Sequence, residues 1–178
     1  MRILLIIATG FLIGCQPPAV VQAAAAAGGE PIQPPCFEPA DDCGQLLVDQ
    51  IDAAEREILI MAYAFSERRI ANALAAAVER GVRVRMIVDR RRDRTGLMTT
   101  LPGRGVELLT DPVDVQHNKV MIFDRRRLAT GSQNFTRGSR NNAENLLLID
   151  HEATVAAYVR NWLHRAEQSS PFVAPAAD

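Results

Sequence analysis

Apolar residues recur along the chain with two periods, and the order of these periods predicts an α/β fold. Three stretches have the spacing of an amphipathic helix: 46–54, 66–81 and 151–167. Six shorter apolar runs predict strands: 57–63, 82–89, 106–109, 117–124, 127–132 and 143–149. Because a strand, a helix and a strand follow one another over 57–89, the first two strands should be parallel and joined by a right-handed crossover. We therefore expect a mixed β-sheet flanked by helices.

Polar residues and glycine mark where the first two helices should begin and end. Asp41 and Asp42 precede the first helix and are candidate N-caps, because a short carboxylate can accept the unpaired N–H groups of the first turn. Ser66 and Glu67 open the second helix, and Gly81 is expected to end it. These residues set the limits of the two predicted helices.

The first 14 residues have the pattern of a secretory signal. An apolar run over 3–13 is about 11 residues long, whereas a helix needs roughly 20 to span a bilayer. The run ends in LIGC, which resembles the lipobox of bacterial lipoproteins, where the cysteine is acylated. Two interpretations remain open: a lipid anchor on Cys15, with Gln16 favouring the outer membrane, or an ordinary signal peptide cleaved in the following Ala-rich stretch. Both predict a periplasmic protein.

The stretch after the signal predicts a tether, and the folded domain follows it. Residues 15–35 are rich in Pro, Ala and Gly and too poor in varied apolar residues for a core. We expect the domain over 36–168 and a disordered tail over 169–178. Cys36 and Cys43 are seven residues apart, and in an oxidising compartment this spacing favours a local disulfide. A metal site would need further Cys or His nearby, so we expect none.

The charge of the chain is uneven although its sum is close to zero. Its 178 residues, 48% of them hydrophobic, fit one globular domain and exclude intrinsic disorder or a polytopic membrane protein. The 20 Lys+Arg and 21 Asp+Glu give a net charge of -1, which alone would argue against a polyanionic partner. Residues 67–140, however, hold 16 basic and 8 acidic residues, a net charge of +8. Every basic residue except Lys119 is arginine.

One group of polar residues in this basic half points to phosphate chemistry. Its members are, in order, His117, Lys119, Asp124, Gly131, Ser132 and Asn134. At every fixed position they match H-x-K-x4-D-x6-G-S-x-N, so the chain resembles the phospholipase D superfamily. The resemblance covers about residues 36–165 and is greatest to small bacterial endonucleases with one such motif per chain. It implies a phospholipase D-like α-β-α sandwich.

Strand geometry predicts that the polar side chains of the motif meet at one end of a hairpin. Residues two apart in a strand point to the same face, so His117 and Lys119 project together, as do Ser132 and Asn134. A turn at 125–127 would fold the second strand back onto the first. The pairs expected from that turn are Asn134 beside Asn118 and Ser132 beside Val120.

Asp124 should lie too far from the other motif residues to touch the reacting phosphorus. It is seven residues from His117, about 23 Å at ~3.3 Å per residue of strand. We expect Asp124 to have a structural role at the turn, paired with the adjacent arginines, and Gly131 to be structural as well.

The remaining motif residues have the chemistry that hydrolysis of a phosphodiester requires. The nonbridging oxygens must be neutralised, a nucleophile must attack and the leaving oxygen must be protonated. Lys119, Ser132 and Asn134 can bind the oxygens, and His117 can attack phosphorus to form a phosphohistidine. Glu144 could accept the other imidazole N–H, as a carboxylate does in a triad. No cofactor is expected.

One histidine cannot serve at once as nucleophile and as general acid. In the superfamily two copies of the motif face each other, and this chain contains one copy. His151 and His164 lack the following x-Lys, and we expect them at the surface or in packing. The resemblance therefore implies a two-fold symmetric homodimer with the active site across its interface.

Three functions remain open on the sequence. The first is a metal-independent, sequence-nonspecific endonuclease acting on DNA, with RNA as a further substrate. The second is a phospholipase that cleaves the head group of a glycerophospholipid, and the third is an inactive module that binds DNA or anionic surfaces. Arg90, Arg91 and Arg92 follow a strand end, where they either contact a polyanion backbone or solvate a loop. The few apolar residues over 90–104 favour the nuclease.

Overall fold

The computed structural model of the chain describes residues 33–91 and 96–173. The strands are β1 (Cys36–Glu38), β2 (Glu57–Ala62), β3 (Arg83–Asp89), β4 (Glu107–Asp111), β5 (Lys119–Phe123), β6 (Arg127–Gly131), β7 (Glu144–Ile149) and β8 (Ser170–Pro171). The helices are α2 (Cys43–Ala53), α3 (Arg68–Glu79), α4 (Leu97–Thr100) and α5 (Glu152–Gln168), with short 3-10 helices η1 (Pro102–Arg104) and η2 (Arg137–Asn141). The signal, the tether and Cys15 lie outside the described residues.

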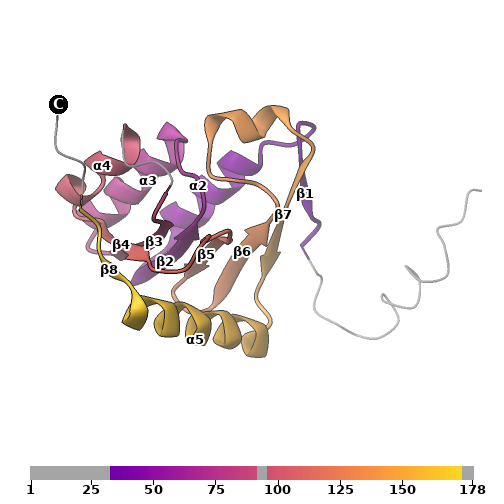
Figure 1. Cartoon of the computed structure of the whole chain (residues 1–178). Helices are drawn as coiled ribbons and strands as arrows, with labels where there is room; N and C mark the ends of the chain where they lie inside the picture. Colours follow the sequence, from indigo (N-terminus) through magenta and orange to yellow (C-terminus); the bar gives the residue numbers. More distant parts are fainter. Residues whose placement is uncertain (1–32, 92–95, 174–178) are drawn as a thin grey trace, which may run out of the picture. The chain divides into compact units, whose positions relative to one another are not determined.

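The strands form one mixed sheet in the order β1-β7-β6-β5-β2-β3-β4-β8 (Figure 1). β2, β3 and β4 run parallel, and the other neighbouring pairs are antiparallel. The predicted parallel pair over 57–89 is confirmed, with α3 as the crossover. The motif therefore lies on β5 and β6, next to the centre of the sheet.

Helices cover both faces of the sheet, which explains why its central strands are apolar almost throughout. α2 and α3 lie on one face and α5 on the other (Figure 1). Alternate side chains of one strand enter two separate cores: Ile58 and Ile60 belong to the core under α2 and α3, whereas Leu59 and Met61 belong to the core under α5. The predicted α/β class, with helices on both sides of a mixed sheet, is confirmed.

Trp162 anchors α5 to the sheet. Its side chain is fully buried, its indole N–H donates to the carbonyl of Ile60 over 2.9 Å, and the Arg85 guanidinium lies 4.6 Å from the ring centroid. Val155 and Val159 share the buried face of the helix, as the sequence pattern predicted. None of the helices within 33–91 and 96–173 has the length and apolarity to cross a membrane.

The predicted N-cap of α2 also ties this helix to α3. The Asp42 carboxylate accepts the backbone N–H of Gln45 over 3.0 Å and two hydrogen bonds of 2.9 Å from the Arg69 guanidinium. These charge-assisted bonds lower the pKa of Asp42. Glu67 caps α3, and Gly81 follows that helix with a φ of +90°, as a C-terminal glycine is expected to do.

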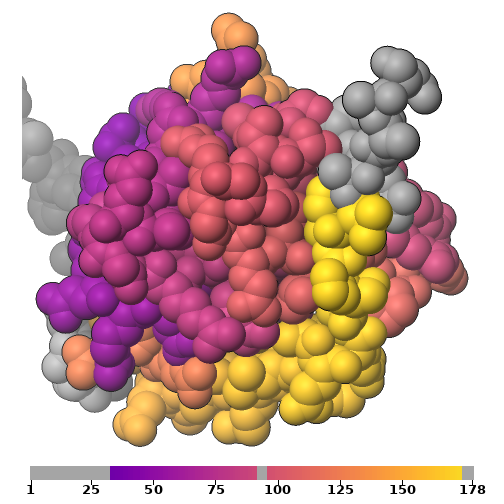
Figure 2. Space-filling model, turned by 90° about the vertical axis from the view of Figure 1, so that its left-hand side faces the viewer, coloured from indigo at the N-terminus to yellow at the C-terminus, as the bar shows by residue number. Residues whose placement is uncertain are grey.

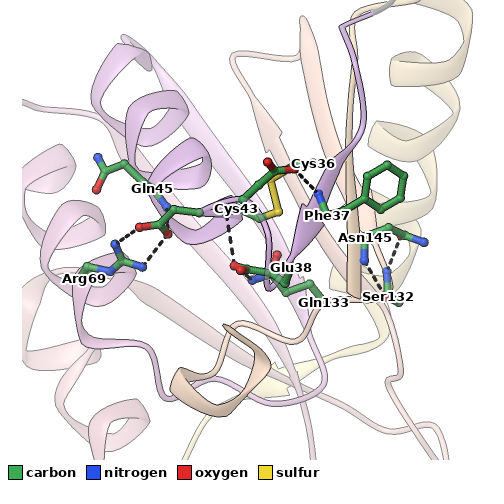
Figure 3. The surroundings of a disulfide bond; sticks show 11 residues. Cys36, Phe37, Glu38, Cys43, Gln45, Arg69, Ser132, Gln133 and Asn145 are labelled. Carbon is green, nitrogen blue, oxygen red and sulfur yellow. Dashed lines mark hydrogen bonds and ion pairs between the residues drawn. A yellow bond between two sulfur atoms is a disulfide. The ribbon is translucent and has the colours of Figure 1, made fainter. Parts of the chain in front are cut away.

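A disulfide and an unpredicted edge strand begin the domain (Figure 3). Cys36 and Cys43 are bonded, with their Cα atoms 5.7 Å apart, and so join β1 to the start of α2. β1 pairs with β7, which places Glu38 opposite Glu144. Glu38 is buried and accepts the Cys43 backbone N–H and the Gln133 side-chain amide, each over 3.2 Å. The disulfide is therefore linked to the strand that carries Glu144.

The C-terminal stretch continues the sheet further than the sequence indicated. Ser170 and Pro171 form β8 and pair with β4, so the assignment of 169–178 as a disordered tail is wrong at these two residues. In the space-filling view the yellow residues of α5 and β8 lie beside rose-coloured residues of the β4 region (Figure 2). Residues 174–178 lie outside the described range.

Candidate active site

His117 and Lys119 lie where β5 begins, beside the end of the neighbouring strand β2. Lys119 is the first residue of β5 and pairs with Ala62 of β2, and its side chain is buried, with 6% exposed. His117 precedes the strand and is exposed. The Lys119 Nζ lies 3.0 Å from Nδ1 and 3.1 Å from Nε2 of His117, and it donates to the His117 carbonyl over 2.8 Å. An exposed imidazole and a buried ammonium thus meet at one point.

Tyr63 contacts both members of this pair. Its ring centroid is 4.5 Å from that of His117, with the planes tilted by 54°, and the Lys119 Nζ is 5.0 Å from the Tyr63 ring centroid. The aromatic face favours the cation while the ring contact limits the rotation of the imidazole. Tyr63 was not among the residues singled out from the sequence, because it directly follows β2 and is brought to the motif by the pairing of β2 with β5.

Lys119 is the one lysine or arginine that is buried within 33–91 and 96–173. Desolvation lowers its pKa, and the nearby Glu144 carboxylate partly opposes this effect. A desolvated ammonium interacts more strongly with an incoming phosphate oxygen than a solvated surface cation does, because less water screens it. The position therefore suits a group that neutralises charge on a substrate.

Gly131 and Ser132 close the site from β6. A Cβ on Gly131 would lie 2.1 Å from the carbonyl oxygen of Asn145, so no larger residue fits between β6 and β7. Ser132 forms two hydrogen bonds with Asn145: its backbone N–H donates to the Asn145 side-chain oxygen over 3.1 Å, and its Oγ accepts the Asn145 backbone N–H over 3.0 Å. The glycine of the motif allows the close approach that fixes the serine.

The side-chain oxygen of Asn134 is the next feature of the site. This atom, Oδ1, is buried and has no hydrogen-bond partner in the structure, and a buried amide oxygen without a partner is uncommon. The neighbouring Phe135 is buried and forms a bridge with Phe65, while its carbonyl accepts the backbone N–H groups of Ser66 and Glu67. The loop after β6 is therefore firmly attached to the loop after β2.

A pocket of about 270 Å³ opens between the two halves of the motif. Its lining consists of His117, Asn118, Lys119, Thr130, Gly131 and Ser132. Two other pockets, of about 280 and 360 Å³, lie near the β5–β6 turn and are lined by arginines and carboxylates without a histidine. Only the first of these three holds the residues that phosphate chemistry requires.

Glu144 does not make the contact expected of it. Its carboxylate accepts the Ser132 hydroxyl and, over 3.2 Å, the Asn142 side-chain amide, instead of a His117 N–H. Glu144 is the first residue of β7, and the hydrogen bonds between Ser132 and Asn145 bring the Glu144 carboxylate close to the serine. The structure thus brings Glu144 to the edge of the site through Ser132.

The register of the β5–β6 hairpin differs from the predicted one by two residues. Val120 pairs with Thr130 instead of Ser132, because the turn is the three-residue loop 124–126. Asp124 and Arg125 both have positive φ, 53° and 56°, which shifts the turn toward the N-terminus. A shift of two residues preserves the side of the sheet to which each residue points, so the motif still converges.

Asp124 lies at the far end of this hairpin, and its contacts are with backbone. Its carboxylate accepts the N–H groups of Glu55, Arg56 and Glu57 over 3.0, 2.8 and 3.0 Å. These bonds lower its pKa, although burial opposes them. The expected pairing with adjacent arginines is wrong, since Arg125 pairs with Glu57. Asp124 therefore fastens the start of β2 to the hairpin turn.

The arginines after β3 are engaged by an acidic residue. Arg90 and Arg91 both pair with Asp114, over 3.0 and 3.3 Å, and all three side chains remain substantially exposed. Arg92 lies outside the described residues. A role for Arg90 and Arg91 in substrate binding would require them to exchange Asp114 for a phosphate. Within the described part of the chain, no three His, Cys, Asp or Glu side chains form a group that could hold a metal ion.

The chain is similar in sequence to phospholipase D-like proteins. A family model described as "Cardiolipin synthase, PLD-like domain" matches residues 47–166. A protein named phospholipase D from Rickettsia felis is 37% identical over 134 residues, which cover 73% of this chain and 67% of that protein. Human mitochondrial cardiolipin hydrolase is 31% identical over 125 residues, covering 67% and 49% respectively.

Solved structures agree with this similarity. The phospholipase D family member Nuc from Salmonella typhimurium superposes with a TM-score of 0.72 at 31% identity, covering 78% of this chain and 96% of that one. NucT from Helicobacter pylori also gives a TM-score of 0.72, at 21% identity and with 78% and 98% coverage, which shows a shared fold.

Proposed function

The chain belongs to the phospholipase D superfamily, and from this premise we propose that it is a metal-independent endonuclease that hydrolyses phosphodiester bonds of DNA, with RNA as a further substrate. The observation that carries the proposal is the exposed His117 imidazole beside the buried Lys119 ammonium. One group is open to attack a substrate, and the other is placed to neutralise the charge that attack builds up.

In the first step a ring nitrogen of His117 attacks phosphorus. A P–N bond forms, the P–O bond to the leaving group breaks, and the leaving oxygen takes up a proton. Lys119 binds the nonbridging oxygens, with the side-chain N–H of Asn134 as a further donor, and Ser132, held by Asn145 and Glu144, lines the pocket beside Lys119. In the second step water attacks phosphorus, loses its proton to a base, and the P–N bond breaks to regenerate the imidazole.

The acid of the first step and the base of the second should be one residue, since the group that has given its proton to the leaving oxygen is then able to accept a proton from the attacking water. We assign this role to His117 of a second copy of the chain, in a two-fold symmetric homodimer with the active site across the interface. The exposure of His117 supports the assignment, because a partner histidine needs open access to the same phosphate. Light scattering that finds an active monomer would contradict it.

The exposed apolar side chains near the site are few and scattered, which favours a polynucleotide over a lipid. Among the described residues, the large apolar side chains with substantial exposure are Phe37, Val115, Leu147 and Val173. Of these only Val115 is a near neighbour of His117 in the chain. Leu147 is the cross-strand partner of the pocket residue Thr130, and Phe37 is the partner of Asn145, so both are single strand residues beside the site and not parts of an apolar loop. A lipid enzyme would be expected to have apolar loops around its pocket.

Phospholipid hydrolysis is the second candidate, and the names of the Rickettsia phospholipase D proteins and of mitochondrial cardiolipin hydrolase favour it. The match to Nuc supports the nuclease. Both reactions would use the same histidine chemistry, so only the substrate separates them. An inactive binding module, the third possibility on the sequence, would have no need for the Lys119–His117 contact.

One experiment distinguishes these functions. Purified protein is incubated with plasmid DNA or with phosphatidylcholine and cardiolipin vesicles, each in excess EDTA, beside a His117→Ala variant. DNA cleavage that persists in EDTA and disappears in the variant supports the proposal. Lipid turnover would favour the phospholipase, binding without turnover the inactive module, and loss of cleavage in EDTA would refute the metal-free mechanism.

We also propose a periplasmic location, with the chain held at the outer membrane through a lipid on Cys15. The Cys36–Cys43 disulfide supports an oxidising compartment. Incorporation of labelled palmitate that is lost in Cys15→Ser is the expected result. A protein without label, found free in the periplasmic fraction, would instead indicate an ordinary signal peptide.

A further inference from the structure

A buried polar cluster behind His117 takes no part in the chemistry proposed above. It consists of Asp89 at the end of β3, Asp111 at the end of β4, and Gln116 in the connection to β5. Their exposed fractions are 2%, 0% and 1%. Asp89 and Asp111 are in register on neighbouring parallel strands, so two carboxylates are buried side by side. Such burial is costly unless each oxygen is hydrogen-bonded.

Gln116 supplies a donor to each of the two carboxylates. Its backbone N–H donates to an oxygen of Asp89 over 2.7 Å, and its side-chain Nε2 donates to an oxygen of Asp111 over 2.7 Å. The other carboxylate oxygens accept from the Arg91 N–H over 2.9 Å, the Val113 N–H over 3.2 Å and the Arg165 guanidinium over 3.4 Å. Gln116 thus bridges the ends of β3 and β4.

The side-chain oxygen of Gln116 is directed toward the motif. It accepts the backbone N–H of Asn118 over 3.2 Å and also the Asn118 side-chain amide. The carbonyl of Asn118 in turn accepts the backbone N–H of Tyr63 over 3.1 Å. The residues on both sides of His117 are therefore fixed by hydrogen bonds, although His117 itself is exposed.

We propose that Gln116 is a positioning residue for the reaction: it connects the buried Asp89 and Asp111 carboxylates to the backbone on either side of His117. It holds the imidazole against Lys119 without touching the substrate. The inference rests on the proposed role of His117 as nucleophile. A rigid backbone under an exposed nucleophile keeps the attacking nitrogen aligned, and small misplacements of a reacting group can cost about 100-fold in rate.

The variant Gln116→Glu tests the bridge through its pH dependence. An ionised carboxyl at this position cannot donate to Asp111, and it faces Asp89 from β3 and Asp111 from β4, with Arg165 from α5 as the cation on Asp111. Its pKa should therefore be raised. When protonated, the introduced carboxyl can donate to Asp111 and accept from Asn118, as the amide does.

We expect a loss of kcat that acid partly reverses. At neutral pH, kcat on bis-p-nitrophenyl phosphate in the variant should be roughly 10- to 100-fold below wild type, with KM changed less than about threefold. The ratio of variant to wild-type kcat should rise as the pH is lowered. The control Gln50→Glu adds the same charge near the hairpin turn, where Gln50 accepts from Arg127. Its ratio should stay constant with pH.

Amide hydrogen exchange in the unmodified protein provides a test that does not depend on the folding of a variant. Although Asn118 is exposed, its backbone N–H should exchange at least about tenfold more slowly than an unstructured amide, because Gln116 accepts it. Exchange at the unprotected rate, or a kcat ratio for Gln116→Glu that is flat with pH, would overturn the proposal. Absence of any wild-type turnover would refute the proposed function. The exchange rate of the Asn118 amide would still show whether Gln116 holds the backbone beside His117.

Discussion

Asp124 makes its contacts with the backbone far from the pocket, so its substitution separates folding from catalysis. The carboxylate accepts three backbone N–H groups, from Glu55, Arg56 and Glu57. A hydrogen bond to a charged group contributes about 1.5–3 kcal/mol, but water can replace the carboxylate at the exposed Glu55 and Arg56. We therefore expect Asp124→Ala to lower the free energy of unfolding by about 2–4 kcal/mol, with about 1 kcal/mol more for the positive φ.

Asp124→Asn is the milder variant, because asparagine tolerates positive φ and keeps one side-chain oxygen as acceptor. Its expected cost is about 1–2 kcal/mol at neutral pH. The folded-state pKa of Asp124 lies below its ordinary value of 3.8, so its stabilisation is present above that pH and is lost as the pH falls through the folded pKa. The difference between wild type and Asp124→Asn should accordingly shrink in acid.

The assay is urea denaturation at neutral and acid pH, together with kcat at 25 °C on a small phosphodiester. Arg126→Ala is the control, since Arg126 is exposed in the same turn. We expect both Asp124 variants to keep wild-type kcat while folded. A stable Asp124→Asn protein whose kcat has fallen more than about tenfold would refute the structural role and place the residue in the chemistry.

Three further outcomes follow from other parts of the structure. Lys119→Met should abolish turnover yet raise the free energy of unfolding, measured in urea at neutral pH. Because burial lowers the Lys119 pKa, this gain in stability should shrink as the pH rises toward the ordinary value of 10.5. A gain that is independent of pH would contradict this reasoning. Gly131→Ala forces a Cβ against the Asn145 carbonyl and should cost at least about 1–3 kcal/mol in the same assay; wild-type stability would contradict the close approach. Replacing Cys36 and Cys43 by serine should cost about 2–3 kcal/mol, and an unchanged denaturation midpoint would show that the disulfide does not stabilise the fold.

The elements that the sequence predicted well are those whose own side chains determine them. β2 and β3 are continuous apolar runs, and α5 has a buried stripe ending at Trp162, so local patterning was sufficient. β1 and β8 are three and two residues long, and their pairing depends on partners far along the chain. Short strands of this kind carry too few residues for a periodic signal.

The site was predictable in its membership and less so in its geometry. The motif identified His117 and Lys119, but the hairpin register depended on two residues with positive φ in an Asp-Arg-Arg turn, which composition does not indicate. Gln116 escaped notice because a lone glutamine has no characteristic chemistry. Its role depends on two carboxylates that strand pairing brings together.

The central claim is that His117 forms a covalent bond to phosphorus. Single turnover of a labelled DNA oligonucleotide in EDTA, quenched under alkaline denaturing conditions that preserve a phosphohistidine, followed by peptide mass spectrometry, tests it directly. We predict a phosphoryl-DNA adduct on the peptide that contains His117, labile to acid and absent in His117→Asn. Cleavage that proceeds without any adduct, or an adduct on another residue, would contradict the mechanism.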